Sequence, residues 1–228
     1  MHVPDGFLDA PTSIATGVVA AAGVAVALRG ARKELDDRTA PLAGLVATFV
    51  FAAQMINFPV AGGTSGHLLG GVLAAVLAGP FTAVLCLSVV LLVQALLMAD
   101  GGVTALGTNI TLMGIVGVVA GWLVFRGVLS VLPKRRSMVA PAAAVAALVS
   151  VPTAALAFTA LFVIGGTAPV DSGKVLVAMV GWHVVIGIGE AVITALVVGS
   201  VVASRPDLVY GARHLLADRE LEIRKAVA

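Results

Sequence analysis

The stretch HLLGGVLAAVLAGPFTAVLCLSVVLLVQALLMA, residues 67–99, decides the fold, because it lacks Asp, Glu, Lys and Arg and is interrupted once, at Gly79–Pro80. An apolar helix needs about 20 residues to cross the roughly 30 Å of bilayer hydrocarbon. The part before the interruption would reach only about 20 Å at 1.5 Å of rise per residue. Residues 67–99 are therefore either two helices, the first short, or one long helix kinked at the proline.

The composition places the whole chain in a membrane. Of its 228 residues, 60% are hydrophobic and 11% are charged, against about 45–50% and about 25% in soluble domains. This excludes a soluble globular domain, a disordered chain and a disulfide scaffold, and the single Cys86 cannot form an internal disulfide. The net charge of +2 is too small to suggest binding to nucleic acid.

Lys and Arg favour cytoplasmic loops, so their distribution chooses between the two readings. With seven spans and an outside N-terminus, 13 of the 14 fall on the inner side and only Lys174 falls outside. If 67–99 were one span, the best split would be nine against five. We therefore predict an all-α, multi-pass protein of the cell membrane, with its N-terminus outside, its C-terminus cytoplasmic and seven transmembrane helices at 12–28, 40–57, 67–79, 81–99, 108–132, 138–165 and 174–203.

These spans divide the chain into two parts. Residues 1–203 form a polytopic membrane domain, and residues 204–228 form a charged tail that we expect to be a cytoplasmic helix, solvated or docked on a partner. The N-terminus MHVPDGFLDA has no basic segment and does not resemble a cleaved signal peptide.

Polar and glycine-rich segments collect on the outer side in this topology. They are residues 1–5, 54–67 and 99–109. Irregular backbone at the membrane edge is tolerated only when it is buried in protein or lines a cavity. We expect these segments to cap an outward-facing pocket, with Gln54 and Gln94 bonding across helices.

His2 is the most informative residue. A free Met1 amine, the His2 amide and the His2 imidazole follow one another and can close fused chelate rings on one metal. Nitrogen ligands in a tetragonal plane are typical of Ni(II) or Cu(II), with Co(II) a plausible relative. His67 ends the glycine-rich loop on the same side and is the candidate fourth nitrogen. The alternative is a surface His2 and a helix-capping His67.

Other residues have more than one interpretation. His183 and Glu190 are seven residues apart and share a helix face. Each is a structural support or part of a proton path, and His183 is alternatively a further ligand. Asp100 and Asn109 bracket a turn and could support a ligating histidine. Gly17, Ala21 and Ala25 form a small-residue stripe that packs internally or docks another membrane subunit. The residues expected to support the loops or the metal ligands are Asn57, Ser65, Asp100, Asn109, His183 and Glu190.

No segment indicates an enzyme. The stretch APVDSGKV lacks the first glycine and the final Ser/Thr of a phosphate-binding loop. We find no nucleophile beside a base and no paired catalytic carboxylates. The chain is not expected to hydrolyse ATP itself.

Four motifs resemble those of the substrate-specific membrane subunit of energy-coupling-factor cobalt/nickel transporters, the CbiM/NikM family. They are MHVPDGFLD (1–9), QMINFPVAGGTSGHLLGG (54–71), LLMADGGVTALGTNI (96–110) and HVVIGIGEAVIT (183–194). The resemblance implies a seven-helix protein that captures Co(II) or Ni(II) as transported substrate through the Met1 amine, the His2 amide and imidazole, and His67.

The resemblance also implies partners. These are a transmembrane coupling subunit, two cytoplasmic ATPases and a small accessory membrane protein, which would be a separate chain. The coupling subunit would dock on small residues of early helices, which suits Gly17, Ala21 and Ala25. The alternative function is an ion-coupled secondary transporter using Glu190, His183 and Asp100. The four nitrogens do not distinguish cobalt from nickel.

Overall fold

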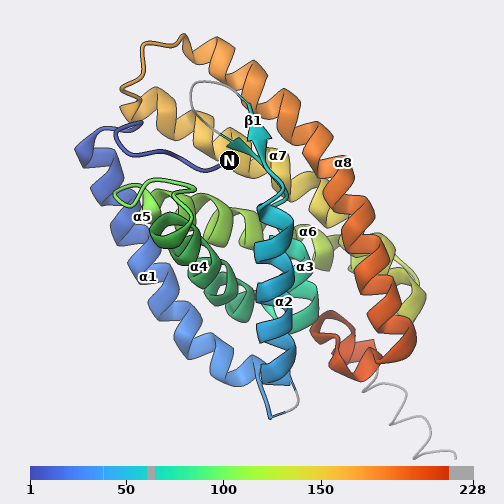
Figure 1. The fold of residues 1–228 in the computed structure, drawn as a ribbon. Helices are drawn as coiled ribbons and strands as arrows, with labels where there is room; N and C mark the ends of the chain where they lie inside the picture. The colour runs from blue at the N-terminus through green and yellow to red at the C-terminus, as the bar shows by residue number, and fades with distance from the viewer. Residues whose placement is uncertain (38, 61–64, 216–228) are drawn as a thin grey trace, which may run out of the picture.

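The apolar runs are helices in the computed structural model, which describes residues 1–37, 39–60 and 65–215 (Figure 1). The first two helices are joined to the rest by a short antiparallel hairpin, in which Phe58 pairs with Gly66 and Pro59 with Ser65. In chain order the elements are α1 (Ala10–Glu34), α2 (Thr39–Gln54), β1 (Phe58–Pro59), β2 (Ser65–Gly66), α3 (Gly71–Ala78), α4 (Pro80–Leu97), α5 (Leu106–Asn109), the π-helical η1 (Ile110–Gly117), α6 (Val118–Val131), the 3-10 helix η2 (Arg136–Met138), α7 (Val139–Gly165), α8 (Ser172–Ser204), and the 3-10 helices η3 (Pro206–Leu208) and η4 (Tyr210–Ala212).

The described helices confirm an all-α membrane protein. Five helical runs in the described ranges are long and apolar enough to cross a membrane: Ala10–Glu34, Pro80–Leu97, Leu106–Val131, Arg136–Gly165 and Ser172–Ser204. The remaining two predicted spans correspond to shorter helices, α2 with 16 residues and α3 with eight. The number of crossings and their orientation stay predictions.

The break in residues 67–99 separates two helices, as the seven-span prediction requires. Gly79 has a φ of +105°, and a Cβ at this position would lie 2.5 Å from the Glu34 carboxylate. That buried carboxylate accepts hydrogen bonds from the Phe81 N–H at 3.1 Å and the Thr82 N–H at 2.7 Å. The end of α1 therefore caps α4, whose first residue is Pro80.

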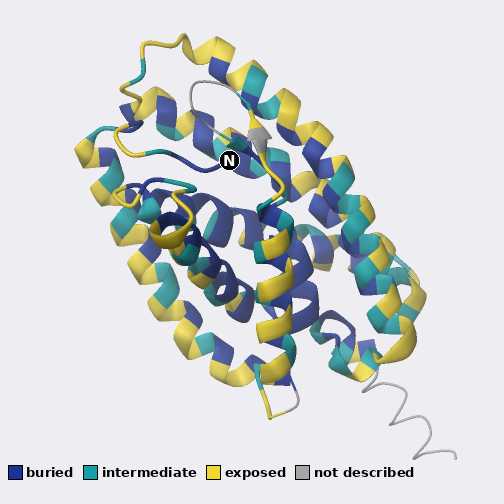
Figure 2. Ribbon diagram, viewed as in Figure 1, coloured by how far each residue is buried: buried dark blue, intermediate teal, exposed yellow. Residues whose placement is uncertain are grey.

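The short helix α3 lies at the centre of the bundle. All eight of its residues are buried, and it contacts α2, α4, α6, α7 and α8. The outer faces of α1 and α8 are largely exposed, while α3 is dark blue in Figure 2. The exposed residues include large apolar side chains, such as Ile14, Val177 and Leu196, which suit contact with lipid.

The small-residue stripe of α1 is mostly on the outside. Ala21 and Ala25 are exposed, whereas Gly17 is half-buried beside α5. A Cβ on Gly107 would lie 2.5 Å from the Gly17 Cα, so α1 and α5 approach closely here. A neighbouring stripe, which includes Ala20 and Ala27, is the one that packs inward.

The beginning of the tail folds back onto the bundle. Pro206 opens η3, and η4 packs against α3. Gly211 lies against the Phe125 ring, and the Arg213 guanidinium donates to the Glu34 carbonyl at 3.1 Å. Residues 206–212 thus form short 3-10 helices and not the expected α-helix, because the proline and glycine disfavour one. Residues 216–228 of the predicted tail lie outside the described residues.

Candidate metal centre

The first residues of the chain enter the bundle, as the position of the N label in Figure 1 shows. Met1 and Val3 are fully buried, and His2 is 3% exposed. The backbone of Val3 is held on both sides by Asn109, whose Oδ1 accepts from the Val3 N–H at 2.8 Å and whose Nδ2 donates to the Val3 carbonyl at 3.2 Å. These contacts fix the N-terminal segment, so the α-amino group has a defined place.

The α-amino group of Met1 lies against strand β2 and donates to the carbonyl of Ser65. Burial lowers the pKa of this amine to about 4, although the charge of Asp100 acts in the opposite direction. At pH 7 the amine is therefore neutral and carries a lone pair that can bind a metal.

The imidazole of His2 has an acceptor at each nitrogen. Nε2 donates to Gln94 Oε1 at 3.1 Å, because a carbonyl oxygen can only accept. Nδ1 lies 3.1 Å from Asp100 Oδ1 and 3.5 Å from Ser65 Oγ. A bare lone pair on Nδ1 would face a carboxylate, so this atom suits either a proton or a metal cation.

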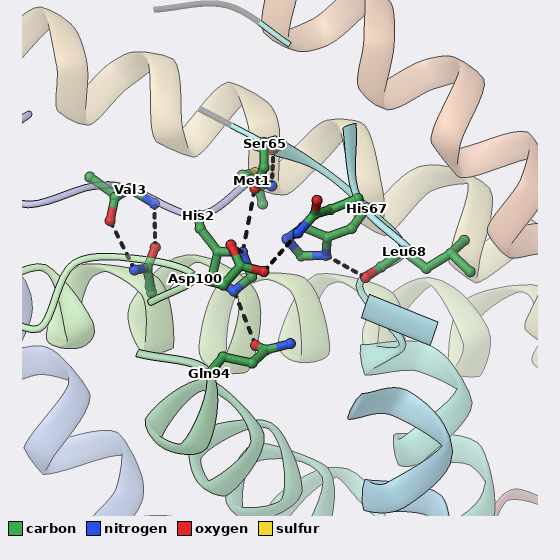
Figure 3. Close-up of polar contacts among 10 residues, drawn as sticks. Met1, His2, Val3, Ser65, His67, Leu68, Gln94 and Asp100 are labelled. Atoms are coloured by element: carbon green, nitrogen blue, oxygen red, sulfur yellow. Dashed lines mark hydrogen bonds and ion pairs between the residues drawn. The ribbon is translucent and has the colours of Figure 1, made fainter. Parts of the chain in front are cut away.

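The imidazole of His67 presents a free lone pair beside His2. Its Nδ1 donates to the Leu68 carbonyl at 2.7 Å, which leaves Nε2 unprotonated. Nε2 is buried and has no hydrogen-bond partner in the described part of the chain. The two rings are stacked, with centroids 4.4 Å apart and planes inclined by 29°. In Figure 3, Met1, His2 and His67 lie beside one another.

Four nitrogens are thus brought together: the Met1 amine, the His2 amide, His2 Nδ1 and His67 Nε2. Within the described ranges, no three His, Cys, Asp or Glu side chains form a group that could hold a metal. Half of the candidate ligands are backbone atoms, so a metal here would depend on the chelate rings of the first two residues. One ring closes through amine and amide, and the second through amide and Nδ1.

The loop after α4 supports His2. Asp100 Oδ2 accepts from Asn57 Nδ2 at 2.9 Å. Burial raises the pKa of Asp100, but the hydrogen bonds and charges around it, chiefly from His2, outweigh burial and hold the pKa below its usual value. Gly101 has a φ of +90°, and a Cβ on it would lie 3.1 Å from His2 Cδ2. Only glycine follows this path so close to the ring.

The two buried glutamines have hydrogen-bond partners other than those expected from the sequence. Gln94, expected to bond across helices, holds His2 instead. Gln54 Nε2 donates to the Leu69 carbonyl at 2.7 Å and so holds the segment after His67. The sequence predicts a polar role for each, but not the partner. No local signal indicates that a partner of Gln94 lies 92 residues away.

Glu190 holds the same segment from α8. Its carboxylate accepts from the Leu69 N–H at 2.6 Å and the Gly70 N–H at 3.0 Å. His183 is also buried on this face of α8. The structure therefore brings Asn57, Ser65, Asp100 and Asn109 around the N-terminal segment, and Glu190 behind His67.

We predict that Glu190→Gln weakens the hold on His67. The amide NH2 of the glutamine would face a backbone N–H that now donates to a carboxylate oxygen. Leaving that buried N–H without an acceptor costs about 1–3 kcal/mol of unfolding free energy. We expect metal affinity to fall about tenfold. Calorimetry and thermal unfolding in detergent measure both, and Glu190→Asp serves as the charge-conserving comparison. Unchanged affinity in a destabilised Glu190→Gln protein would contradict a positioning role.

A cavity of about 360 Å³ opens next to His2. Its lining comes from the three outer segments that the sequence predicts to cap a pocket, namely the N-terminal residues, β2 and the loop after α4. Asp5 and Asp100 give it two carboxylates, which suits a cation on its way to the nitrogens. The lining residues are His2, Pro4, Asp5, Ser65, Ala95, Ala99, Asp100, Gly101, Gly102 and Val103.

Comparisons of the sequence with known proteins identify a family. Residues 2–208 match the family CbiM, described as cobalt uptake substrate-specific transmembrane region. A Haloquadratum walsbyi protein named for metal transport is 39% identical over 210 residues, covering 92% of this chain and 94% of that protein. The Geobacter sulfurreducens cobalt transport protein CbiM is 34% identical over 218 residues, covering 91% of this chain and 61% of that protein.

The fold has a close counterpart among solved structures. The crystal structure of a truncated transition metal transporter is 31% identical, with a TM-score of 0.83, and the match covers 89% of this chain and 99% of that one. Both the sequence and the fold therefore relate this protein to metal transporters over most of its length. The chain belongs to the CbiM family of cobalt-uptake substrate-specific transmembrane proteins.

Proposed function

We propose that this chain is the substrate-binding component of an ATP-driven energy-coupling-factor transporter that imports Co(II) or Ni(II) across the cell membrane. The observation that carries the proposal is the convergence of the Met1 amine, the His2 imidazole and the His67 imidazole. With the His2 amide they offer four nitrogen ligands and no thiolate, which suits these borderline metals.

Capture would proceed through the outer cavity. The metal would pass Asp5 and Asp100 and bind the lone pairs of His2 Nδ1 and His67 Nε2, and any proton on Nδ1 would leave to water in the cavity. Loss of the His2 amide proton to water would complete the chelate. Asn57 and Asn109 hold the loop and the N-terminal segment in place, so little reordering is needed when the metal arrives.

Partners follow from the same proposal. ATP would be hydrolysed by two cytoplasmic subunits, and a transmembrane coupling subunit would dock on α1 beside Ala21 and Ala25, which are exposed. A small accessory membrane protein completes the assembly. Residues 1–203 would cross the membrane seven times, with the N-terminus outside and the cytoplasmic tail beginning at residue 204.

Uptake of radioactive cobalt into vesicles tests the coupling. We expect uptake by the chain together with its partners, dependent on ATP, and none by the chain alone under a pH gradient. Gradient-driven uptake by the chain alone that is lost in Glu190→Gln would overturn the proposal in favour of an ion-coupled transporter.

A further inference from the structure

The side chain of Gln94, near the end of α4, is fully buried and contacts the His2 ring (Figure 3). Gln94 Oε1 lies 3.1 Å from His2 Nε2. The other end of the amide, Gln94 Nε2, is buried without a hydrogen-bond partner in the described part of the chain. Buried polar atoms are usually paired, so the position of Gln94 is explained by its oxygen and not by its amino group.

The backbone of Gln94 holds the loop that carries Asp100. Its carbonyl accepts from the Met98 N–H and from the Asp100 N–H, each at 3.1 Å. The Asp100 carboxylate in turn lies 3.1 Å from His2 Nδ1. Gln94 therefore contacts one ring nitrogen of His2 through its side chain and, through its backbone, places the group that faces the other nitrogen.

Only one of the two ring nitrogens of His2 can complete the proposed chelate. Starting from the His2 amide nitrogen, a metal closes a ring through Cα, Cβ, Cγ and Nδ1, whereas Nε2 lies on the far side of the imidazole and cannot reach the same ion. A neutral imidazole has a proton on one nitrogen and a lone pair on the other. Metal binding therefore requires the proton on Nε2 and the lone pair on Nδ1.

Asp100 and Gln94 favour opposite placements of that proton. A carboxylate is a stronger hydrogen-bond acceptor than a neutral carbonyl, so Asp100 alone favours the proton on Nδ1, where it blocks the metal. Gln94 Oε1 accepts from a proton on Nε2 and favours the tautomer that the chelate needs. Without this oxygen, a proton on Nε2 would be buried with no acceptor, because His2 is almost fully buried.

We propose that Gln94 is a positioning residue of the metal site, whose Oε1 keeps a proton on His2 Nε2 and so makes Nδ1 the nitrogen that binds Co(II) or Ni(II). The inference rests on the proposed function, since it needs His2 as a ligand. His67 is arranged by the same rule, because the Leu68 carbonyl accepts from its Nδ1 and leaves Nε2 for the metal. In each ring a carbonyl oxygen takes one nitrogen and leaves the other as the candidate ligand.

Titration calorimetry of Gln94→Leu and Gln94→Glu in detergent tests the proposal. Leucine fills a similar space without an acceptor, and we expect the Kd for Co(II) and Ni(II) to rise about 10–100-fold. Glutamate keeps an oxygen at the position of Oε1 and gives up only the amino group, which has no partner in the described residues. The glutamate variant should therefore bind both metals at least as tightly as the unaltered chain.

Thr82→Val is the matched control, twelve residues or about 18 Å away at the opposite end of α4. Thr82 is buried and its hydroxyl donates to the Glu34 carboxylate at 2.9 Å, so valine removes a buried hydrogen bond far from His2. It should lower thermal stability and leave metal affinity unchanged. Equal losses of affinity in the leucine and glutamate variants, or unchanged affinity in the leucine variant, would reduce Gln94 to packing and overturn the proposal.

Nitrogen-15 NMR of the metal-free protein, labelled in histidine, locates the proton directly, even if the leucine variant does not fold. The His2 signals are those that His2→Gln removes. We expect a proton on His2 Nε2 in the unaltered chain and in Gln94→Glu, and on Nδ1 alone in Gln94→Leu. An unaltered chain with no proton on Nε2 would overturn the proposal, whatever its metal affinity. An unaltered chain that binds neither metal would instead refute the proposed function, and this inference with it.

Discussion

Adding two glycines before Met1 is expected to abolish tight binding of Co(II) and Ni(II). The extension turns the Met1 amine into an amide, which removes one ligand and places the free amine two residues further from His2. Met1 is also fully buried, so an added residue has no space beside Ser65. Changes that only touch the surroundings of a ligand cost 10–100-fold in affinity, so the loss should exceed about 100-fold. Titration calorimetry in detergent measures it.

The comparison for this experiment is a pair of glycines added after Ala228, which should bind metal as the unaltered chain does. Thermal unfolding of both extended proteins shows whether the fold is kept. Equal affinity with and without the N-terminal glycines would mean that the amine is not a ligand. The site would then have to be rebuilt around His67, His183 and the carboxylates.

Replacing His67 by alanine is expected to have an effect of similar size, with a Kd raised by more than about 100-fold for both metals. Its Nε2 has no protein partner to lose in the described residues, and its Nδ1 contacts only the adjacent Leu68 carbonyl. The variant should therefore fold, since Glu190 and Gln54 still hold the segment that follows.

His67→Asn separates packing from ligation in the same measurement. Its amide nitrogen can keep the bond to Leu68, but it offers no imidazole lone pair to a metal. We expect both variants to lose binding to the same extent. An asparagine variant with unaltered affinity would exclude His67 as a ligand and leave it the role of a packed loop residue.

The helices and their order could be predicted from the sequence because charge is excluded from the hydrocarbon. Gly79–Pro80 predicts a break, and the side preferred by Lys and Arg makes it a boundary between two helices. The shortness and burial of α3 are harder to predict, because the run from Gly71 to Ala78 is apolar on every face. Such a run fits surrounding lipid and surrounding protein equally well. Its complete burial depends on five other helices.

The candidate site divides in a similar way. His2 and His67 are predictable, because a free amine followed by histidine has a chemistry of its own and the topology puts His67 on the same side. Gln94 and Gln54 are not, since the sequence does not reveal which backbone or ring a buried amide will meet. That His183 Nε2 carries no proton follows only from the hydrogen bond that its Nδ1 donates to the Met179 carbonyl, which the sequence does not reveal.

The burial of α3 has a consequence for biogenesis. An eight-residue helix is about 12 Å long, too short to be inserted into a bilayer as an independent segment. All of its residues are buried, so contact with lipid does not stabilise it and its stability depends on packing against neighbouring helices. We expect it to enter the bundle together with α4 and to be enclosed only after α7 and α8 have been synthesised. His67, four residues before α3, would then reach its place at the end of assembly, and a nascent chain that stops before α8 should have no metal site.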